Sequence, residues 1–500
     1  MAVAPNLDQC PILPSGTMRH AGRKCFFGFI ALAVTYIILS GIISHFTAGR
    51  HKDPTFDLEN TAWVASSRNV FDRGLCRWFG LCGGFHFLRG GSSEQIDAAL
   101  PIVDFADQWT INPDDSDAWS NEERRLREIP QYVFDYAPYV HLHSEEQYWP
   151  ADIAEHLVHT TQALNYTALT GEAHGLADLN RLNAKDLLGS GRHVYLESMD
   201  DVEGYPSWLS GRRNIPKPFH DADAGHSDQA WPQPIREAAT PHPDLRRRRL
   251  AKQTQANAHV DSNAPRRSSA PAFLITVPKP DGVLDAFWFF FYSFNAAPKV
   301  LNLQFGNHIG DWEHTLVRFR NGVPESLACS EHYFGSAYAY DALEKYVVDE
   351  STGDVRGTWS HDSIAADARR PVIYSAKGSH AMYASPGQHA YILPFNLLRD
   401  QTDRGPLWDP TLNLHAYTYD PANATATLRA ATRNPRSPTG WFDFNGRWGD
   451  KYYLLSDPRQ YRFAGQYHYL NGPYGPKRKG LDRAMVCQNL KRCVIKEEVD

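Results

Sequence analysis

The sequence predicts a mainly β protein: a β-sandwich-like domain with a few peripheral helices, preceded by one transmembrane helix. Aromatic residues make up 12% of the chain, and such side chains are enriched in β-strands. Several strand-like runs are joined by the hairpin-turn pairs Asp281-Gly282 and Asn321-Gly322. Near the N-terminus, residues 25–46 are strongly apolar and contain no Asp, Glu, Lys or Arg. These three observations together define the fold class.

Residues 25–46 are the predicted transmembrane helix, because the run is long enough to cross a bilayer core of about 30 Å. Arg19, Arg23 and Lys24 precede it, so the positive-inside rule favours a cytosolic tail at residues 1–24 and a single-pass type II protein. A cleaved signal peptide is the alternative, although its apolar region is usually only about 7–15 residues long. A buried core helix is a third interpretation. The first two both place the body of the chain in the lumen of the secretory pathway or vacuole, or outside the cell.

The cysteines also bear on the compartment. Cys76 and Cys82 lie close together in the sequence, as do Cys487 and Cys493. In an oxidising lumen each pair could close a short loop, and the alternative is free thiols. We expect two local disulfides. No Cys-x-x-Cys pair is present, which argues against a structural zinc site.

The domain organisation follows from composition. Residues 47–129 are predicted to be a juxtamembrane arm without a clear period, residues 130–475 the β domain, and residues 476–500 a C-terminal tail. Residues 211–271 are rich in Pro, His, Arg, Ser and Ala and lack an apolar period, so we expect a disordered insertion. Its four consecutive arginines at 246–249 belong either to a solvated loop or to a protease processing site. Asn165 and Asn423 begin Asn-x-Thr sequons and are predicted glycosylation sites.

Hydrophobic periodicity places the expected elements along the domain. The predicted strands are residues 131–143 (broken at Pro138), 193–196, 272–277, 286–294, 315–320, 325–334, 371–376, 412–419 and 452–455. The predicted helices are residues 153–164, 177–188, 337–346 and 481–494.

The densest group of chemically active residues is the stretch 306–314, which lies between two predicted strands. If it continues into the second strand, Asp311 and Glu313 share one face and Trp312 and His314 the other, because strand side chains alternate. His308 could join the two carboxylates from the preceding loop. Carboxylate oxygens and an imidazole suit a divalent cation such as Mg²⁺, Mn²⁺ or Ca²⁺. The alternatives are a structural hydrogen-bond network and general acid–base catalysis.

Other polar clusters give weaker predictions. His141 and His143 would share a strand face, which fits either a metal pair or an ordinary surface. Ser379 or Ser330 could form a triad with a histidine, but no Gly-x-Ser-x-Gly motif is present.

The net charge of −6 gives no electrostatic case for nucleic-acid binding.

Four motifs, at residues 136–150, 307–314, 370–383 and 400–410, give the chain a family resemblance. In this order they resemble the vacuolar protein sorting-associated protein 62 family, over about residues 130–460 without the insertion. The family has fungal and plant members. The resemblance implies a fungal, membrane-anchored member associated with delivery of proteins to the vacuole, without assigned catalytic residues.

A more distant likeness concerns the proposed cation. Secreted necrosis-inducing proteins carry a Gly-His-Arg-His-Asp-Trp-Glu heptad on a β-sandwich. His308, Asp311 and Glu313 match the three positions that hold a cation there. Gly310 stands at the position of the second histidine, and no acidic ligand is obvious upstream.

We therefore expect a membrane-anchored protein that acts in vacuolar protein sorting by binding rather than catalysis. The expected partners are the membrane and a cargo, glycan or lipid ligand, with no nucleic acid. The alternatives are a metal-dependent hydrolase of the secretory or vacuolar lumen and a lectin-like or toxin-like membrane-binding module.

Overall fold

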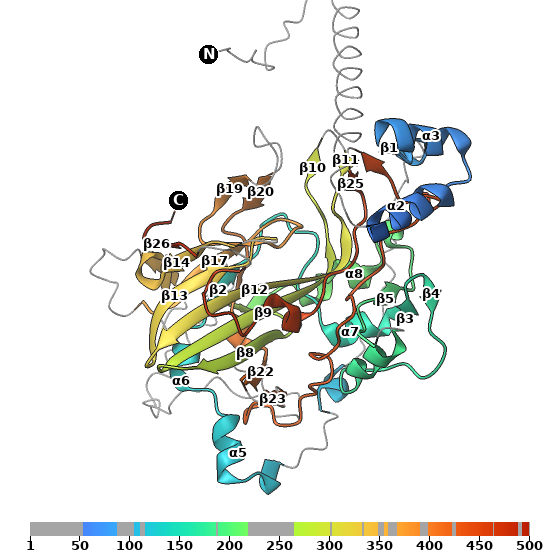
Figure 1. Ribbon diagram of the computed structural model, residues 1–500. Helices are drawn as coiled ribbons and strands as arrows, with labels where there is room; N and C mark the ends of the chain where they lie inside the picture. The colour runs from blue at the N-terminus through green and yellow to red at the C-terminus, as the bar shows by residue number, and fades with distance from the viewer. Residues whose placement is uncertain are drawn as a thin grey trace, which may run out of the picture. The chain divides into compact units, whose positions relative to one another are not determined.

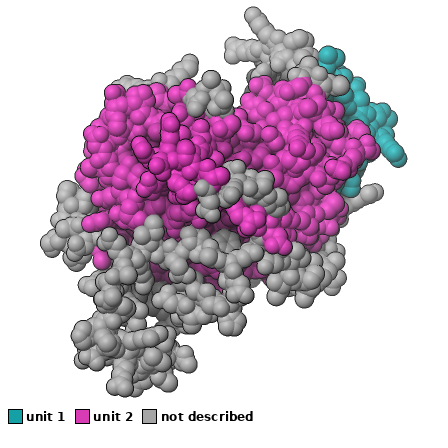
Figure 2. Space-filling model, turned by 90° about the horizontal axis from the view of Figure 1, so that it is seen from below, with its two compact units in different colours: residues 1–90, 453–468 teal, residues 91–452, 469–500 magenta. Residues whose placement is uncertain are grey.

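The computed structural model describes residues 54–87, 105–110, 116–186, 189–218, 265–300, 303–332, 335–348, 355–358, 368–390, 399–422, 427–463, 465–488 and 493–499 (Figure 1). The chain divides into two compact units, residues 1–90 with 453–468 and residues 91–452 with 469–500 (Figure 2). The predicted transmembrane segment 25–46 lies outside the described residues. Within the described part of the chain, no helix is long and apolar enough to span a membrane.

The larger unit is built on two long antiparallel strands, β9 (Val283–Asn295) and β12 (His308–Arg320), which pair along nearly their whole length (Figure 1). They lie in the middle of an eight-stranded sheet with the order β23-β22-β8-β9-β12-β13-β14-β26. The other strands of this sheet are β23 (Leu428–Ala430), β22 (Leu414–Tyr419), β8 (Ala272–Lys279), β13 (Val323–Cys329), β14 (Ala337–Ala339) and β26 (Ile495–Lys496).

Strand β9 is buried on both faces, which explains its continuous aromatic run. Phe287, Phe289 and Phe291 point into one core, which they share with Trp441 and Trp448. The alternate side chains of β9, such as Trp288 and Phe290, point into a second core with Ile373 and Trp408. A strand covered on both sides needs apolar residues at every position rather than at every second one.

A second eight-stranded sheet lies across the second core, as its Ile373 and Trp408 show. Its order is β16-β15-β17-β2-β21-β7-β6, with β18 paired to β17. The bounds are β16 (Val355–Thr358), β15 (Lys345–Val348), β17 (Arg370–Ser375), β2 (Tyr139–His141), β21 (Leu407–Trp408), β7 (Arg266–Arg267), β6 (Lys217–Pro218) and β18 (Met382–Tyr383). Smaller sheets are formed by β3 (Thr160–Leu164), β4 (Thr167–Ala168) and β5 (Val194–Ser198), by β10 (Lys299–Val300) and β11 (Leu303–Gln304), and by β19 (Gly387–Ala390) and β20 (Arg399–Thr402).

The mainly β prediction is confirmed, and so are most of the predicted strands. Those predicted at 193–196, 272–277, 286–294, 315–320, 371–376 and 412–419 correspond to β5, β8, β9, β12, β17 and β22, with ends shifted by a few residues. The strand predicted at 325–334 ends at Cys329, and residues 452–455 form no strand.

The predicted strand at residues 131–143 was wrong in its first half. The chain first forms helix α6 (Gln131–Asp135), and β2 begins only at Tyr139. Tyr132 and Tyr136 are one helical turn apart, and both rings pack on Phe319. In a helix, side chains four residues apart lie about 6 Å from each other and can both contact Phe319, whereas in a strand they would lie about 13 Å apart.

The predicted helices were also too long or misassigned. Helix α7 (Ile153–Val158) stops before the β-branched pair Thr160 and Thr161, which enters β3. Residues 337–346 form β14, a 3-10 turn and the start of β15, because pairing with neighbouring strands overrides helix propensity there. The predicted helix 177–188 is a 3-10 helix at Leu179–Lys185, and the described residues within 481–494 form no helix.

The predicted arm, insertion and tail contain more structure than composition indicated. The arm holds helices α2 (Pro54–Ser66), α3 (Val70–Phe79), α4 (Gly84–Phe87) and α5 (Asn121–Leu126). Strands β6 and β7, at the two ends of the predicted insertion, pair with each other, and β26 of the tail joins the central sheet. The four arginines at 246–249 and the sequon residue Asn423 lie outside the described residues.

The smaller unit combines α2, α3, α4 and β1 (Leu81–Cys82) with β24 (Arg462–Phe463) and β25 (Gln466–Tyr467). Trp63 of α2 is buried, donates a hydrogen bond to the carbonyl of Tyr453 over 2.9 Å, and packs on Tyr467. A disulfide joins Cys76 to Cys82 in this unit, and another joins Cys487 to Cys493 in the larger one.

Candidate functional site

The stretch singled out in the sequence opens strand β12. Asp311 lies opposite Tyr292 of β9, whereas β13 pairs with β12 only from Thr315 onward. Trp312 packs in the aromatic core on one face of the sheet, with Phe291 at 4.8 Å between ring centroids. Asp311 and Glu313 make their contacts on the other face, as the alternation predicts. The backbone thus gathers the two carboxylates at a part of the strand that β13 does not cover.

Asp311 pairs with His380, a fully buried histidine of the 370–383 motif. The Nδ1 atom of His380 lies 3.0 Å from Oδ2 of Asp311, and its Nε2 lies 2.9 Å from the carbonyl oxygen of Tyr148. The ring stacks on Tyr292 with 3.7 Å between centroids. Since both partners are acceptors, the imidazole donates from both nitrogens and is cationic. Burial alone would lower its pKa, but Asp311 and Glu146 raise the pKa of His380 above its ordinary value.

Glu146 completes this ion cluster from the segment between β2 and α7. One carboxylate oxygen accepts hydrogen bonds from the backbone N–H groups of Gln147 and Tyr148, both at 2.8 Å. The other oxygen accepts from the backbone N–H of Gly378 over 2.8 Å. The carboxylate also lies 3.9 Å from Nε2 of His380. A histidinium between two carboxylates therefore ties three separate chain segments together.

A second cluster is centred on Asp400 of β20, which is buried. Its carboxylate accepts hydrogen bonds from Ser379 at 2.7 Å and Tyr383 at 2.8 Å, and one oxygen lies 2.8 Å from Nε2 of His332. Burial opposes protonation of His332, but Asp400 raises the pKa of its imidazole above the usual value. The Ser379 hydroxyl is thus directed at a carboxylate rather than at an imidazole.

Glu313 differs from Asp311 because its partner is a hydroxyl. The Ser330 hydroxyl donates to the Glu313 carboxylate, and the same Ser330 oxygen accepts from the backbone N–H of His314 over 2.9 Å. Burial raises the pKa of Glu313 to about 8; nearby Lys479 opposes the shift and Asp311 adds to it. Burial therefore favours the neutral form of Glu313 in this arrangement.

His308 lies at the first position of β12. Its Nδ1 is 2.7 Å from the carbonyl oxygen of Gly310, so Nδ1 carries the proton and donates. Burial lowers the pKa of His308, against the opposing effect of Asp311. The lowered pKa favours the neutral form of the ring.

The arrangement of His308, Asp311 and Glu313 does not fit a bound metal ion as it stands. Among the described residues, no group of three or more His, Cys, Asp and Glu side chains is placed to hold a metal ion. Asp311 already accepts from His380 and Glu313 from Ser330. A cation would have to displace these donors and remove the proton from Glu313.

The other histidine pair is also held by protein partners. His141 lies 2.7 Å from the carbonyl oxygen of Gly405 through Nδ1 and 2.9 Å from the Tyr346 hydroxyl through Nε2. His143 instead accepts a hydrogen bond from the backbone N–H of Glu145 at Nδ1. The two imidazoles thus serve separate contacts in the described structure.

The backbone at Gly310 explains why this chain has a glycine where the heptad of the necrosis-inducing proteins has its second histidine. Its φ is +70°, and a Cβ atom there would lie 1.7 Å from the carbonyl oxygen of Trp448. A histidine, or any L side chain, would meet both backbone strain and a clash with main-chain atoms.

We expect Gly310→Ala to lower the free energy of unfolding by roughly 2–3 kcal/mol, because the left-handed backbone conformation and the clash with the Trp448 carbonyl oxygen both destabilise the folded state. Urea unfolding followed by tryptophan fluorescence would measure the change. Gly189→Ala is the matched control, since Gly189 has φ +62° but no atom within 4 Å of the added Cβ. Equal losses in the two variants would show that the Trp448 carbonyl does not constrain this site.

No family model matches the chain. It is 37% identical over 414 residues to TDA6 of Saccharomyces cerevisiae, a candidate vacuolar protein sorting-associated protein; the match covers 80% of this chain and 75% of the relative. It is 35% identical over 375 residues to vacuolar protein sorting-associated protein 62 of the same organism, covering 73% of this chain and 68% of the relative. The chain belongs to the vacuolar protein sorting-associated protein 62 family. The family resemblance predicted from the four motifs is confirmed.

Solved structures give only weak matches. NLPPya in complex with mannosamine shares 14% identity and a TM-score of 0.15, over 29% of this chain and 50% of that one. Necrosis and Ethylene inducing Protein 2, from the causal agent of witches' broom disease of cocoa, shares 11% identity and a TM-score of 0.13, over 21% of this chain and 50% of that one. Scores this low carry no argument about fold or ligand.

The family's sequence motifs meet in space in this member. Glu146, Asp311, His380 and Asp400 each come from a different one of the four motifs at 136–150, 307–314, 370–383 and 400–410. Glu146, Asp311 and His380 form the first cluster, and Asp400 holds Ser379, the residue before His380. The four motifs could be recognised in the sequence, but the contacts between their side chains could not be predicted from it.

Proposed function

We propose that this member of the family acts in vacuolar protein sorting as a membrane-anchored lumenal protein that binds a ligand and does not turn over a substrate. Family membership supports the sorting role. The apolar run at residues 25–46 supports anchoring, and the two disulfides support an oxidising compartment for the body. The sequons at Asn165 and Asn423 would then be available for glycosylation.

The observation that favours binding over hydrolysis is the direction of the two serine hydroxyls. A serine nucleophile needs an adjacent base, usually an imidazole, to take its proton. Ser330 donates to Glu313 and Ser379 donates to Asp400, while His380 and His332 contact carboxylates. These contacts order the site and leave neither hydroxyl activated by a histidine.

A yeast sorting assay tests the proposal. A Saccharomyces cerevisiae strain lacking both relatives would express the full-length chain, and the secreted fraction of a soluble vacuolar hydrolase would be measured. We expect the chain to reduce this secretion and Asp311→Asn to lose the effect, because the substitution removes a charge from the His380 cluster. Asp341→Asn is the control, since Asp341 is exposed. Secretion that stays unchanged when the wild-type chain is expressed would refute the sorting role.

A divalent cation (Mg²⁺, Mn²⁺ or Ca²⁺) at His308, Asp311 and Glu313 is a separate proposal. Binding would require Glu313 to lose its proton and Ser330 to turn away. Metal content of the purified full-length chain, measured by mass spectrometry, tests it. If the proposal is right, Glu313→Gln removes the metal and Asp341→Asn does not. Metal-free wild-type protein, with a melting temperature unaffected by the three cations, would leave the structural network as the correct interpretation.

A further inference from the structure

Helix α3 of the smaller unit exposes an unusually apolar face. Five of its ten residues are large, hydrophobic and at least one third exposed. Their exposed fractions are 68% for Val70, 78% for Phe71, 37% for Leu75, 76% for Trp78 and 39% for Phe79. Phe71, Leu75 and Trp78 follow one another at intervals of about one helical turn, and Val70 and Phe79 flank them on the same side of the helix, so the five form one continuous face. A contiguous apolar face on a rigid element, unlike scattered apolar residues, indicates a contact surface.

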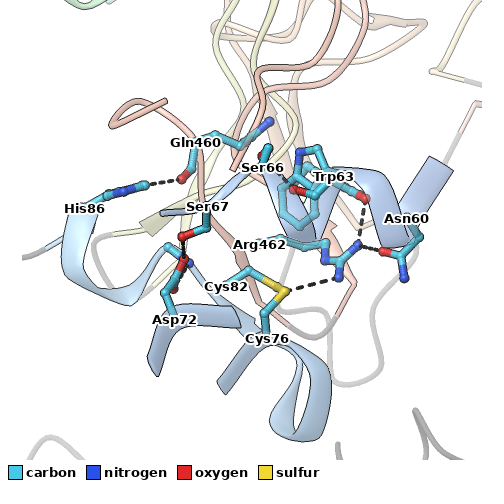
Figure 3. Close-up of a disulfide and its surroundings, with 12 residues drawn as sticks. Asn60, Trp63, Ser66, Ser67, Asp72, Cys76, Cys82, His86, Gln460 and Arg462 are labelled. Carbon is cyan, nitrogen blue, oxygen red and sulfur yellow. Dashed lines mark hydrogen bonds between the residues drawn. A yellow bond between two sulfur atoms is a disulfide. The ribbon is translucent and has the colours of Figure 1, made fainter. Parts of the chain in front are cut away.

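The helix cannot turn this face inward, because its opposite side is fixed (Figure 3). Cys76 is bonded to Cys82. The Asp72 carboxylate accepts hydrogen bonds from the backbone N–H of Gly83 at 2.7 Å and from the Ser67 hydroxyl at 3.1 Å. Asp72 and Cys76 are one turn apart and both are buried. The apolar face is therefore held outward by covalent and polar contacts.

The ends of α3 are fixed as well. Asn69 caps the first turn by accepting hydrogen bonds from the backbone N–H groups of Phe71 and Asp72. Gly80 ends the helix with φ +65°, the left-handed conformation common at helix C-termini. The exposed face thus belongs to a preformed helix and needs no folding step to bind.

The charges around the face are basic. Arg68 and Arg77 are exposed, and Arg73 is partly exposed. The one acidic residue of α3, Asp72, is buried and hydrogen-bonded within the unit. An amphipathic helix with aromatic residues on one face and arginines beside it suits the boundary between acyl chains and headgroup phosphates.

The chain places a bilayer within reach of this face, if residues 25–46 are the membrane anchor proposed above. Only residues 47–53 separate that run from α2. Seven residues span at most about 25 Å when fully extended. The smaller unit, which begins with this linker, must then lie next to the membrane surface.

We infer that the α3 face binds the lipid bilayer as an interfacial helix, with Phe71, Trp78 and their neighbours in the headgroup region and Arg68 and Arg77 at lipid phosphates. This inference rests on the proposed anchoring. It gives the protein a second membrane contact, which fixes the smaller unit against the bilayer. The occupant is the lipid itself and not a partner protein.

The experiment uses the full-length chain reconstituted into vesicles that contain phosphatidylcholine and phosphatidylserine. Cys10 and Cys25 are replaced by serine, and Phe71→Cys carries an environment-sensitive fluorophore. We expect its emission to shift to shorter wavelength and to be quenched by lipids that carry a nitroxide near the carbonyl groups. Ser456→Cys is the control in the same unit, because Ser456 is exposed and its backbone contacts Ser66 of α2 rather than α3. Its label should be quenched by aqueous iodide and not by the lipid.

The other outcomes each overturn the inference. A Phe71 label that remains in water while the protein resists alkaline extraction means that the anchor exists but α3 does not touch lipid. A blue-shifted label without lipid quenching means that a second copy or another protein covers the face. A chain that does not stay with the vesicles refutes the anchor and the inference together.

Discussion

Replacing His380 with alanine is expected to lower the free energy of unfolding by about 3–5 kcal/mol, the usual loss when one partner of a buried ion pair is removed. Asp311 would lose the hydrogen bond from Nδ1, and Glu146 would lose the nearby positive charge. Both carboxylates are almost completely buried, so water cannot replace the imidazolium. Urea unfolding at pH 7 measures the change.

His389→Ala is the matched control for this variant. The His389 ring stacks on Tyr383 with 3.8 Å between centroids, much as His380 stacks on Tyr292 at 3.7 Å. His389 contacts the carbonyl oxygen of Ser385 and the hydroxyl of Thr402 instead of a carboxylate. Its removal should cost about 1–2 kcal/mol, the value of stacking and a neutral hydrogen bond. Similar losses in both variants would mean that the ion cluster around His380 adds nothing to stability.

Backbone conformation must be separated from charge at this position. His380 has φ +56°, which alanine tolerates poorly and asparagine tolerates well. His380→Asn keeps the conformation without a cation, and we expect it to lose more than His389→Ala but less than His380→Ala. If His380→Asn were as stable as the wild type, the loss in His380→Ala would be conformational.

The central strand pair could be predicted from the sequence because it depends on local signals. The aromatic run of β9, the alternation in β12 and the Asn321-Gly322 turn are all read within a few residues. The same alternation correctly placed Asp311 and Glu313 on one face and Trp312 on the other. Prediction failed where tertiary contacts determine the secondary structure. Helix α6 is an example, because Tyr132 and Tyr136 both pack on Phe319, which is distant in the sequence.

The partners of the candidate site could not be predicted in the same way. His380 is separated from Asp311 by 69 residues and from Glu146 by more, and no periodicity connects them. The pairing of β17 with β2 is a contact between distant parts of the chain, and it helps to bring the segments around Glu146 and His380 together. Sequence reasoning therefore found the carboxylates and proposed a cation between them, but it did not find His380, which contacts Asp311.

The buried histidines make a second large effect testable through pH. Burial lowers the pKa of His156 and of His415 from 6.5 to about 3. The unfolded chain takes up these protons below pH 6.5, but the folded chain does so only near pH 3. Each histidine thus contributes stability that is present above pH 6.5 and is lost as the pH falls. At pH 5 the loss is about 2 kcal/mol for each, from about 1.5 pH units at 1.36 kcal/mol per unit.

The double variant His156→Phe, His415→Phe isolates this effect because phenylalanine keeps the ring packing and cannot be protonated. His156 packs edge-on against Phe291 at 4.9 Å, and His415 stacks on Trp109 at 4.0 Å. We expect the variant to gain about 4 kcal/mol relative to the wild type when the pH is lowered from 7 to 5. Free energies of unfolding from urea titrations at both pH values measure this gain.

The wild type must be compared with the double variant, because buried carboxyl groups change the free energy of unfolding in the opposite direction when the pH falls. Burial raises the pKa of Glu155 to about 7, although Arg213 opposes the shift, so protonation of Glu155 between pH 7 and 5 adds stability to the folded chain. This contribution is present in both proteins and cancels in the difference. Stability that changes in parallel for the wild type and the double variant would show that His156 and His415 do not titrate on unfolding.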